Sequence, residues 1–113
     1  MYRFEIWTAA LPYQEGSHVI RGQHPVIIVS NDISNERSPV LTVVPMTSNL
    51  KRYAMKTHVL IRGQGLLHDS LALCEQIMPL DKMHMIQRVG YVSNEFDRYA
   101  LMHAIAVQLG IAA

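Results

Sequence analysis

The sequence predicts one mainly β domain, residues 1–113, that ends in a helix. Two runs rich in β-branched residues, Pro25–Asp32 and Val40–Asn49, are typical of strands. The segment 94–109 instead carries apolar residues at helical spacing. Half of the residues are hydrophobic, so a chain of this length can bury one ordinary core. Five or six strands with glycine-containing turns and one terminal helix favour a small β-barrel, with a flatter open sheet as the alternative.

Glycine, proline and short polar runs separate the predicted strands. Gly16 and Gly22 bracket a polar loop that is long enough to be mobile, and Pro79 is expected to end the strand before it. In chain order, the expected segments are a strand at Phe4–Leu11, a loop at Gln14–Gln23, a turn at Asn31–Pro39, a basic loop at Asn49–Lys56, strands at Thr57–Ile61 and Ser70–Gln76, one helical turn at Asp81–Ile86 and a last strand at Gln87–Val92.

The C-terminal helix is predicted from both its ends and its apolar pattern. Ser93 can serve as the N-cap, and Gly110 suits the exit. Apolar residues occupy two sides of this helix, so it needs two partners. One partner is the sheet of the same chain and the other is a second copy, which predicts a homodimer. The first side carries Phe96, Ala100, His103, Ala104 and Val107, and the second carries Leu101, Ile105 and Leu109.

Charge and cysteine content exclude several classes of protein. Ten Lys and Arg against nine Asp and Glu give a net charge of +1, which argues against binding nucleic acid by bulk charge alone. Cys74 is the single cysteine, so no intrachain disulfide can form. The charged N-terminus lacks the apolar stretch of a signal peptide, and no apolar run approaches a membrane span. These features predict a soluble, cytoplasmic protein.

Polar clusters follow the two β-branched runs. Ser30–Asp32 ends the first run and Thr47–Asn49 ends the second. We expect the two clusters to lie side by side at one rim of the sheet and to carry the chemistry of the protein. The basic residues Lys51, Arg52 and Lys56 follow the second cluster directly, where they can attract phosphate groups.

The order of several short motifs resembles the MazF/PemK family of toxins. Each motif is weak alone, but together they span nearly the whole chain and the predicted helix follows them. The matching segments are Glu5–Trp7, Gly16–Ser17, His24–Asp32, Val44–Ser48, Leu73–Ile77 and Leu80–Lys82.

The resemblance implies a fold, an activity and two partners. The fold is an SH3-like barrel of the CcdB/PemK kind that forms a homodimer. The activity is sequence-specific cleavage of single-stranded RNA with no metal or other cofactor, in which the ribose 2′-OH is the nucleophile. A cognate antitoxin peptide lies across the dimer and blocks the RNA groove.

The resemblance also suggests catalytic residues, with two departures from the family pattern. Thr47 matches the hydroxyl residue at the end of the third strand. His24 stands where the family has an arginine before the proline, and Met78 replaces a second customary arginine. An imidazole transfers protons near neutral pH but lacks the permanent charge that holds a phosphate. We therefore expect His24 to transfer protons, Thr47 to bind the phosphate and Arg21 to supply the cation.

Contacts to RNA are expected from residues beside these three, although each also has a structural interpretation. Ser48 can terminate a strand, Glu75 can be a strand-end charge, and Gln76 can bind a loop instead of a base. The histidine pairs lack the spacing of a zinc site, and Cys74 is interpreted as a small core residue. The expected RNA-binding residues are Ser17, Ser48, Asn49, Lys51, Arg52, Glu75 and Gln76.

Two alternatives to an RNA-cleaving toxin are kept. The missing arginines suit a catalytically weak member of the family that binds RNA or an antitoxin-like peptide. A toxin that poisons DNA gyrase, as in the CcdB relatives, is the other alternative. It ranks lower because Ile111–Ala113 offers no aromatic or charged group at the C-terminal end.

Overall fold

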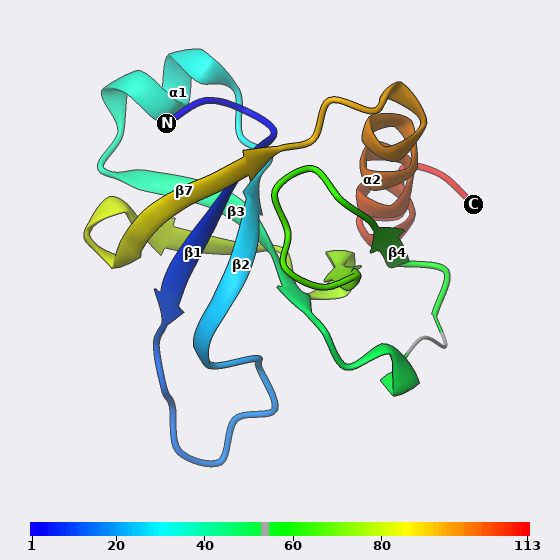
Figure 1. Ribbon diagram of the computed structural model, residues 1–113, viewed down its shortest axis with the longest axis horizontal. Helices are drawn as coiled ribbons and strands as arrows, with labels where there is room; N and C mark the ends of the chain where they lie inside the picture. Colours follow the sequence, from blue (N-terminus) through cyan, green and yellow to red (C-terminus); the bar gives the residue numbers. More distant parts are fainter. Residues whose placement is uncertain (53–54) are drawn as a thin grey trace.

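The computed structural model describes residues 1–52, with Arg52 as backbone only, and residues 55–113. Part of the predicted basic loop Asn49–Lys56 thus lies outside the described residues. Strands dominate the chain and the longer helix comes last (Figure 1). The elements are β1 Glu5–Leu11, β2 Gly22–Ile28, α1 Asp32–Arg37, β3 Val40–Thr47, the 3₁₀ turn η1 Leu50–Arg52, β4 His58–Ile61, β5 Ser70–Leu73, η2 Cys74–Gln76, β6 Met78–Asp81, η3 Lys82–His84, β7 Met85–Tyr91 and α2 Glu95–Gln108.

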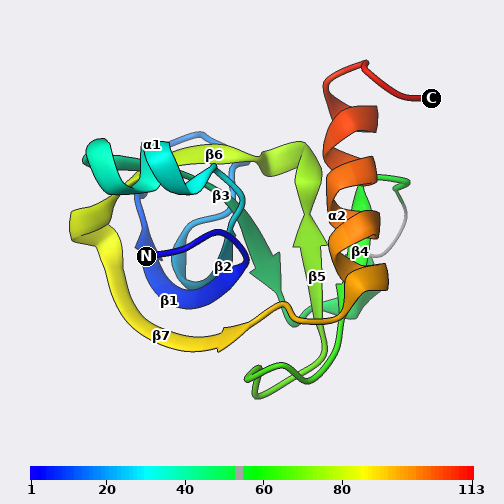
Figure 2. The same ribbon diagram turned by 90° about the horizontal axis from the view of Figure 1, so that it is seen from above.

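The strands form one antiparallel sheet in the order β4-β5-β3-β2-β1-β7. β3 is its centre, because one edge pairs with β2 and the other pairs first with β6 and then with β5. The sheet curls strongly, and α2 lies beside β4 and β5 (Figure 2). The predicted mainly β fold with a terminal helix is confirmed. The barrel is open, since no ladder joins β4 to β7 among the described residues.

Two apolar clusters lie on opposite faces of the central strands. Ile27 and Val44 belong to the cluster under α2, whereas Val26 and Val43 belong to the cluster on the other face. All four side chains are fully buried. In a strand that is buried on both faces, polar and apolar residues do not alternate. This explains the uninterrupted β-branched runs that dominate the sequence.

The C-terminal helix has the predicted extent but a different cap. Asn94, not Ser93, is the N-cap, and its side chain accepts a hydrogen bond of 3.1 Å from the Asp97 amide. Gly110 ends the helix with φ +74°, as glycine can. Leu101 and Ile105 pack on the core. On the other side, Phe96 is 85% exposed and His103 is exposed, whereas Ala100 and Val107 are half-buried and Ala104 is buried.

The predicted meeting of the two polar clusters at one rim is wrong. β2 and β3 are antiparallel, with Val26 opposite Pro45, so the two strands end at opposite edges of the sheet. Ser30 lies beside the first residues of β3, where its Oγ accepts a hydrogen bond of 3.0 Å from the Thr42 amide. Asn31 caps α1 through a 2.9 Å bond from the Ser34 amide, so the predicted turn at 31–39 contains a helix.

The strand predicted at Ser70–Gln76 ends earlier, at Leu73, and η2 follows it. Pro79 does not end a strand but lies within β6, opposite Thr42. Proline is tolerated there because β6 pairs only with β3 among the described residues. The helical turn and last strand predicted after it are confirmed as η3 and β7. None of the described helices has the length and hydropathy to cross a membrane.

Candidate functional site

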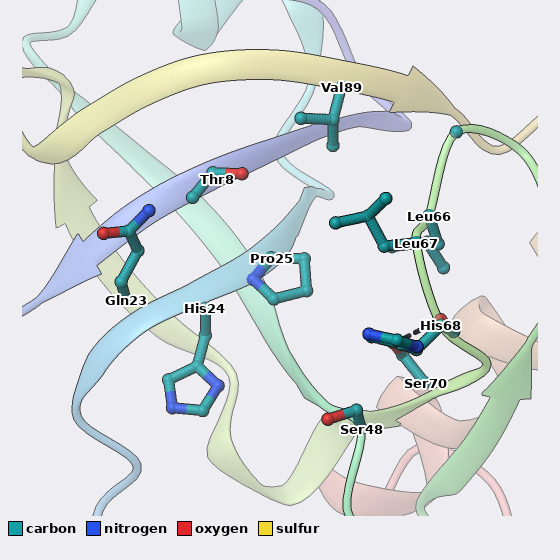
Figure 3. Close-up of a pocket in the computed structure, with 11 residues that line it drawn as sticks. Thr8, Gln23, His24, Pro25, Ser48, Leu66, Leu67, His68, Ser70 and Val89 are labelled. Carbon is teal, nitrogen blue, oxygen red and sulfur yellow. Dashed lines mark hydrogen bonds between the residues drawn. The ribbon is translucent and has the colours of Figure 1, made fainter.

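Two adjoining cavities share the side chain of His24. We call the first, of about 270 Å³, the proline cavity; its walls include Thr8, Pro25, Ser48, His68 and Val89 (Figure 3). The second, of about 280 Å³, we call the loop cavity; its walls include Ser17, His18, Arg21, Thr47 and Asn49. His24 lines both cavities and is half-buried.

The strand register brings His24 and Thr47 together. Val26 lies opposite Pro45, so continuing this antiparallel register places His24 level with Thr47. Side chains alternate along an extended segment. Accordingly Thr47 lines the loop cavity and Ser48 lines the proline cavity, with His24 between them. The predicted proximity of His24, Thr47 and Ser48 therefore holds.

The loop between β1 and β2 supplies the cation. Arg21 lines the loop cavity, stacks on the Tyr13 ring at 4.6 Å from its centroid, and donates a 3.3 Å hydrogen bond to the Ser17 carbonyl. The Ser17 Oγ accepts a 3.1 Å bond from the Val19 amide. Arg21 is exposed, so its guanidinium can also contact a ligand in the cavity. The structure thus joins Ser17, Arg21 and Thr47 as the sequence predicts.

Glu75 and Gln76 are directed into the protein. Glu75 Oε2 lies 2.8 Å from the buried His58 Nε2, which makes an ion pair when His58 is protonated. Gln76 Oε1 accepts a 2.7 Å hydrogen bond from the Ile20 amide, in the loop between β1 and β2. Neither side chain lines the proline cavity or the loop cavity. The structure thus shows Gln76 bound to a loop, which is the structural interpretation of this residue.

The remaining predicted RNA contacts follow β3 in the chain. Asn49 precedes η1, and Lys51 and Arg52 lie within η1. Asn49 lines the loop cavity, and its side chain accepts a 3.3 Å hydrogen bond from the Lys51 amide. Lys51 is exposed beyond the two cavities. The side chain of Arg52 lies outside the described residues.

Cys74 is excluded as a nucleophile at neutral pH. Its side chain is fully buried in the cluster under α2. Burial, and to a smaller extent the Glu75 carboxylate, raise the pKa of the Cys74 thiol from 9.0 to about 12. The interpretation of Cys74 as a core residue is confirmed.

Sequence reasoning missed the far wall of the proline cavity. His68 comes from the segment between β4 and β5, Ser70 begins β5, and Val89 comes from β7. In the sequence, His68 stands out only by its neighbour Asp69, a pair that lacks the spacing of a zinc site. No local pattern links these residues to His24, because their proximity depends on the way the sheet curls.

Comparison with known proteins shows the family of this chain. A family model described as a "PemK-like, MazF-like toxin of type II toxin-antitoxin system" matches residues 2–106. The chain belongs to this MazF-like toxin family. A curated relative, "Endoribonuclease MazF" of Staphylococcus saprophyticus, is 33% identical over 113 residues, which cover 98% of this chain and 92% of the relative.

Solved structures of MazF-like proteins share the fold. The MazF of Deinococcus radiodurans superposes with a TM-score of 0.82 at 14% identity and covers 97% of this chain and 96% of that one. An endoribonuclease from mycobacterial species, solved in complex with its cognate antitoxin, gives a TM-score of 0.81 at 22% identity, with 100% and 98% covered. The expected CcdB/PemK-like architecture is thereby confirmed.

Proposed function

We propose that this MazF-like protein is a sequence-specific endoribonuclease toxin that cuts single-stranded RNA without a metal ion. The observation that carries the proposal is the placement of His24 between Thr47 and Ser48, with Arg21 facing the same loop cavity. A proton-transfer group, two hydroxyls and a guanidinium thus line two cavities that share His24. Membership of the family and the endoribonuclease relative support the choice of RNA as substrate.

The four side chains divide the work of RNA cleavage. The hydroxyls of Thr47 and Ser48 bind the scissile phosphate where the two cavities meet. His24 serves proton transfer as the ribose 2′-OH loses its proton and its oxygen attacks the phosphorus, while the P–O5′ bond breaks and the 5′-oxygen gains a proton. Arg21 neutralises the charge that develops on the phosphorane oxygens. The products carry a 2′,3′-cyclic phosphate and a 5′-OH.

The test is cleavage of a long unstructured RNA in EDTA by the purified protein, with the ends of the fragments mapped. Discrete cuts that leave cyclic phosphate support the proposal. The double variant of His24→Ala and Thr47→Ala should lose cleavage and keep the circular dichroism spectrum of the parent. Cleavage that survives this double change contradicts the assignment of the site.

A binding role is the second candidate, and the substitution at position 24 favours it. His24 lacks the permanent planar charge of arginine, so RNA can be bound in the two cavities and cut slowly. Filter binding of the same RNA separates the two functions. Tight binding with no fragments after long incubation identifies a binding module.

The proposed activity takes place in the cytoplasm and implies two partners. A toxin of this family needs a cognate antitoxin peptide, as the mycobacterial endoribonuclease has in its complex. The exposed side of α2, with Phe96 85% and Tyr99 73% exposed, is the surface we assign to a homodimer. Sedimentation equilibrium should give twice the chain mass, and Phe96→Glu should give the monomer.

A further inference from the structure

We propose that His68 is a second catalytic residue, which shares proton transfer with His24 across the proline cavity. The inference rests on the proposed RNA cleavage and goes beyond the residues assigned to it above. Both imidazoles line this cavity, although they come from distant parts of the chain, β2 and the segment between β4 and β5.

The geometry of the reaction requires two groups. In an in-line displacement the attacking 2′-oxygen and the leaving 5′-oxygen lie on opposite sides of the phosphorus. A proton-transfer group must be within about 3 Å of the atom that it serves. One imidazole therefore cannot serve both oxygens in the same transition state, so His24 needs a partner on the other side of the phosphate.

His68 stands on that other side. Figure 3 shows the His68 imidazole pointing into the proline cavity, with the His24 imidazole on the opposite side. Pro25 and Ser48 border the space between them. A phosphate bound to the Ser48 hydroxyl would thus have an imidazole on each flank.

The segment that carries His68 is held firmly against its neighbours. Gly65 packs backbone to backbone on Gly90 of β7, where a Cβ on either glycine would overlap the other segment. Gln64 accepts a 2.9 Å hydrogen bond from the Ser93 amide and donates a 2.8 Å bond to Asp97 of α2. The Ser70 hydroxyl donates a 2.9 Å bond to the His68 carbonyl. Such support keeps a catalytic side chain in register.

The two histidines differ in chemistry from the rest of the proline cavity and from the charged groups around it. Among the described lining residues of the proline cavity, only His24 and His68 have ionisable side chains. His18 and Arg21 line the adjoining loop cavity. Asp69, beside His68 in the chain, pairs with Arg62 at 3.6 Å.

These two side chains account for both proton transfers of the reaction. One imidazole takes the 2′-OH proton while the 2′-oxygen forms its bond to phosphorus. The P–O5′ bond breaks with its electron pair on the 5′-oxygen, and the other histidine, as imidazolium, donates its proton there. The two histidines finish with exchanged protonation states, and exchange with water resets them.

The first test compares His68→Ala with His84→Ala, a histidine of η3 outside both cavities. His68→Ala should slow cleavage in EDTA about 100-fold and remove one limb of a bell-shaped pH profile. His84→Ala should leave rate and profile unchanged. His68 is exposed, so its variant should unfold at the temperature of the parent protein.

The second test uses RNA with a sulfur in place of the scissile 5′-oxygen. A thiolate leaves without a proton, so this substrate should restore cleavage by one of the two variants, His24→Ala or His68→Ala, whichever lacks the acid. Restoration of neither contradicts the proposal. If the parent protein cuts RNA and His68→Ala cuts equally fast, this inference alone fails. If the parent does not cut, the proposed function fails.

Discussion

Gln76 accepts a hydrogen bond of 2.7 Å from the backbone amide of Ile20, a residue 56 positions away. The bond joins η2, at the end of β5, to the loop that carries Ser17 and Arg21. Through this bond, η2 holds Ile20, which lines the loop cavity. We therefore expect Gln76 to act on the site through Ile20.

Gln76→Leu should release this loop. It leaves the Ile20 amide unpaired, so we expect a loss of about 1 kcal/mol in unfolding free energy and about a tenfold slower cleavage because Arg21 is less well placed. Gln76→Glu keeps the acceptor and should retain most of the rate. Gln87→Leu, at an exposed position of β7, is the matched control. Equal rates for Gln76→Leu and Gln87→Leu would show that the loop needs no anchor.

Thr47→Val removes the hydroxyl and keeps the shape of the side chain, so it tests the role of the hydroxyl alone. Thr47 Oγ1 accepts a 3.2 Å bond from the Asn49 amide and leaves its own proton for a phosphate oxygen. Loss of one such donor costs about 100-fold in rate in other active sites, and we expect that loss in single-turnover cleavage. Thr47→Ser, which keeps the hydroxyl, should cut within about tenfold of the parent. Equal loss in both variants would assign Thr47 a packing role.

Gly65→Ala should disturb the segment that carries His68. Gly65 has φ +99°, and an added Cβ would overlap the backbone of Val89 and Gly90. We expect a loss of about 3 kcal/mol in unfolding free energy. Gly16→Ala is the control, because Gly16 also has a positive φ but open space around it, and it should cost only about 1 kcal/mol. Thermal denaturation of both variants measures the difference, and equal losses would mean that the packing on β7 is loose.

Cys74 should make stability depend on pH in the alkaline range. The pKa of its thiol is about 12 in the folded chain against an ordinary 9.0, so between these values the unfolded chain loses the proton and the folded chain keeps it. The contribution to unfolding free energy is therefore constant below pH 9 and falls as the pH rises toward 12. The stability difference between the parent and Cys74→Ala should shrink over that range. A constant difference would contradict the burial of the thiol.

Local sequence patterns predicted the terminal helix and the described strands other than β6. β-branched runs, helical spacing and the glycine exit are properties of short segments, and each was found within a few residues of its expected place. The errors came at residues that suit two different local structures. Asn31 can end a turn or cap a helix, and it caps α1. Pro79 breaks central strands but fits one that pairs on a single edge.

The candidate site was predicted only in part, because its halves meet through the sheet. His24, Thr47 and Arg21 were found through a resemblance in sequence order, and the antiparallel register explains their proximity. His68 has no such signal. Its position depends on the backbone packing of Gly65 against Gly90, which a single sequence does not reveal.

The most direct measurement is the fate of a long unstructured RNA incubated with the purified protein in EDTA, with both ends of every fragment identified. Our account predicts discrete cuts that leave a 2′,3′-cyclic phosphate and a 5′-OH, lost in the double variant of His24→Ala and Thr47→Ala. Intact RNA, or fragments with the same ends from the double variant, would contradict it.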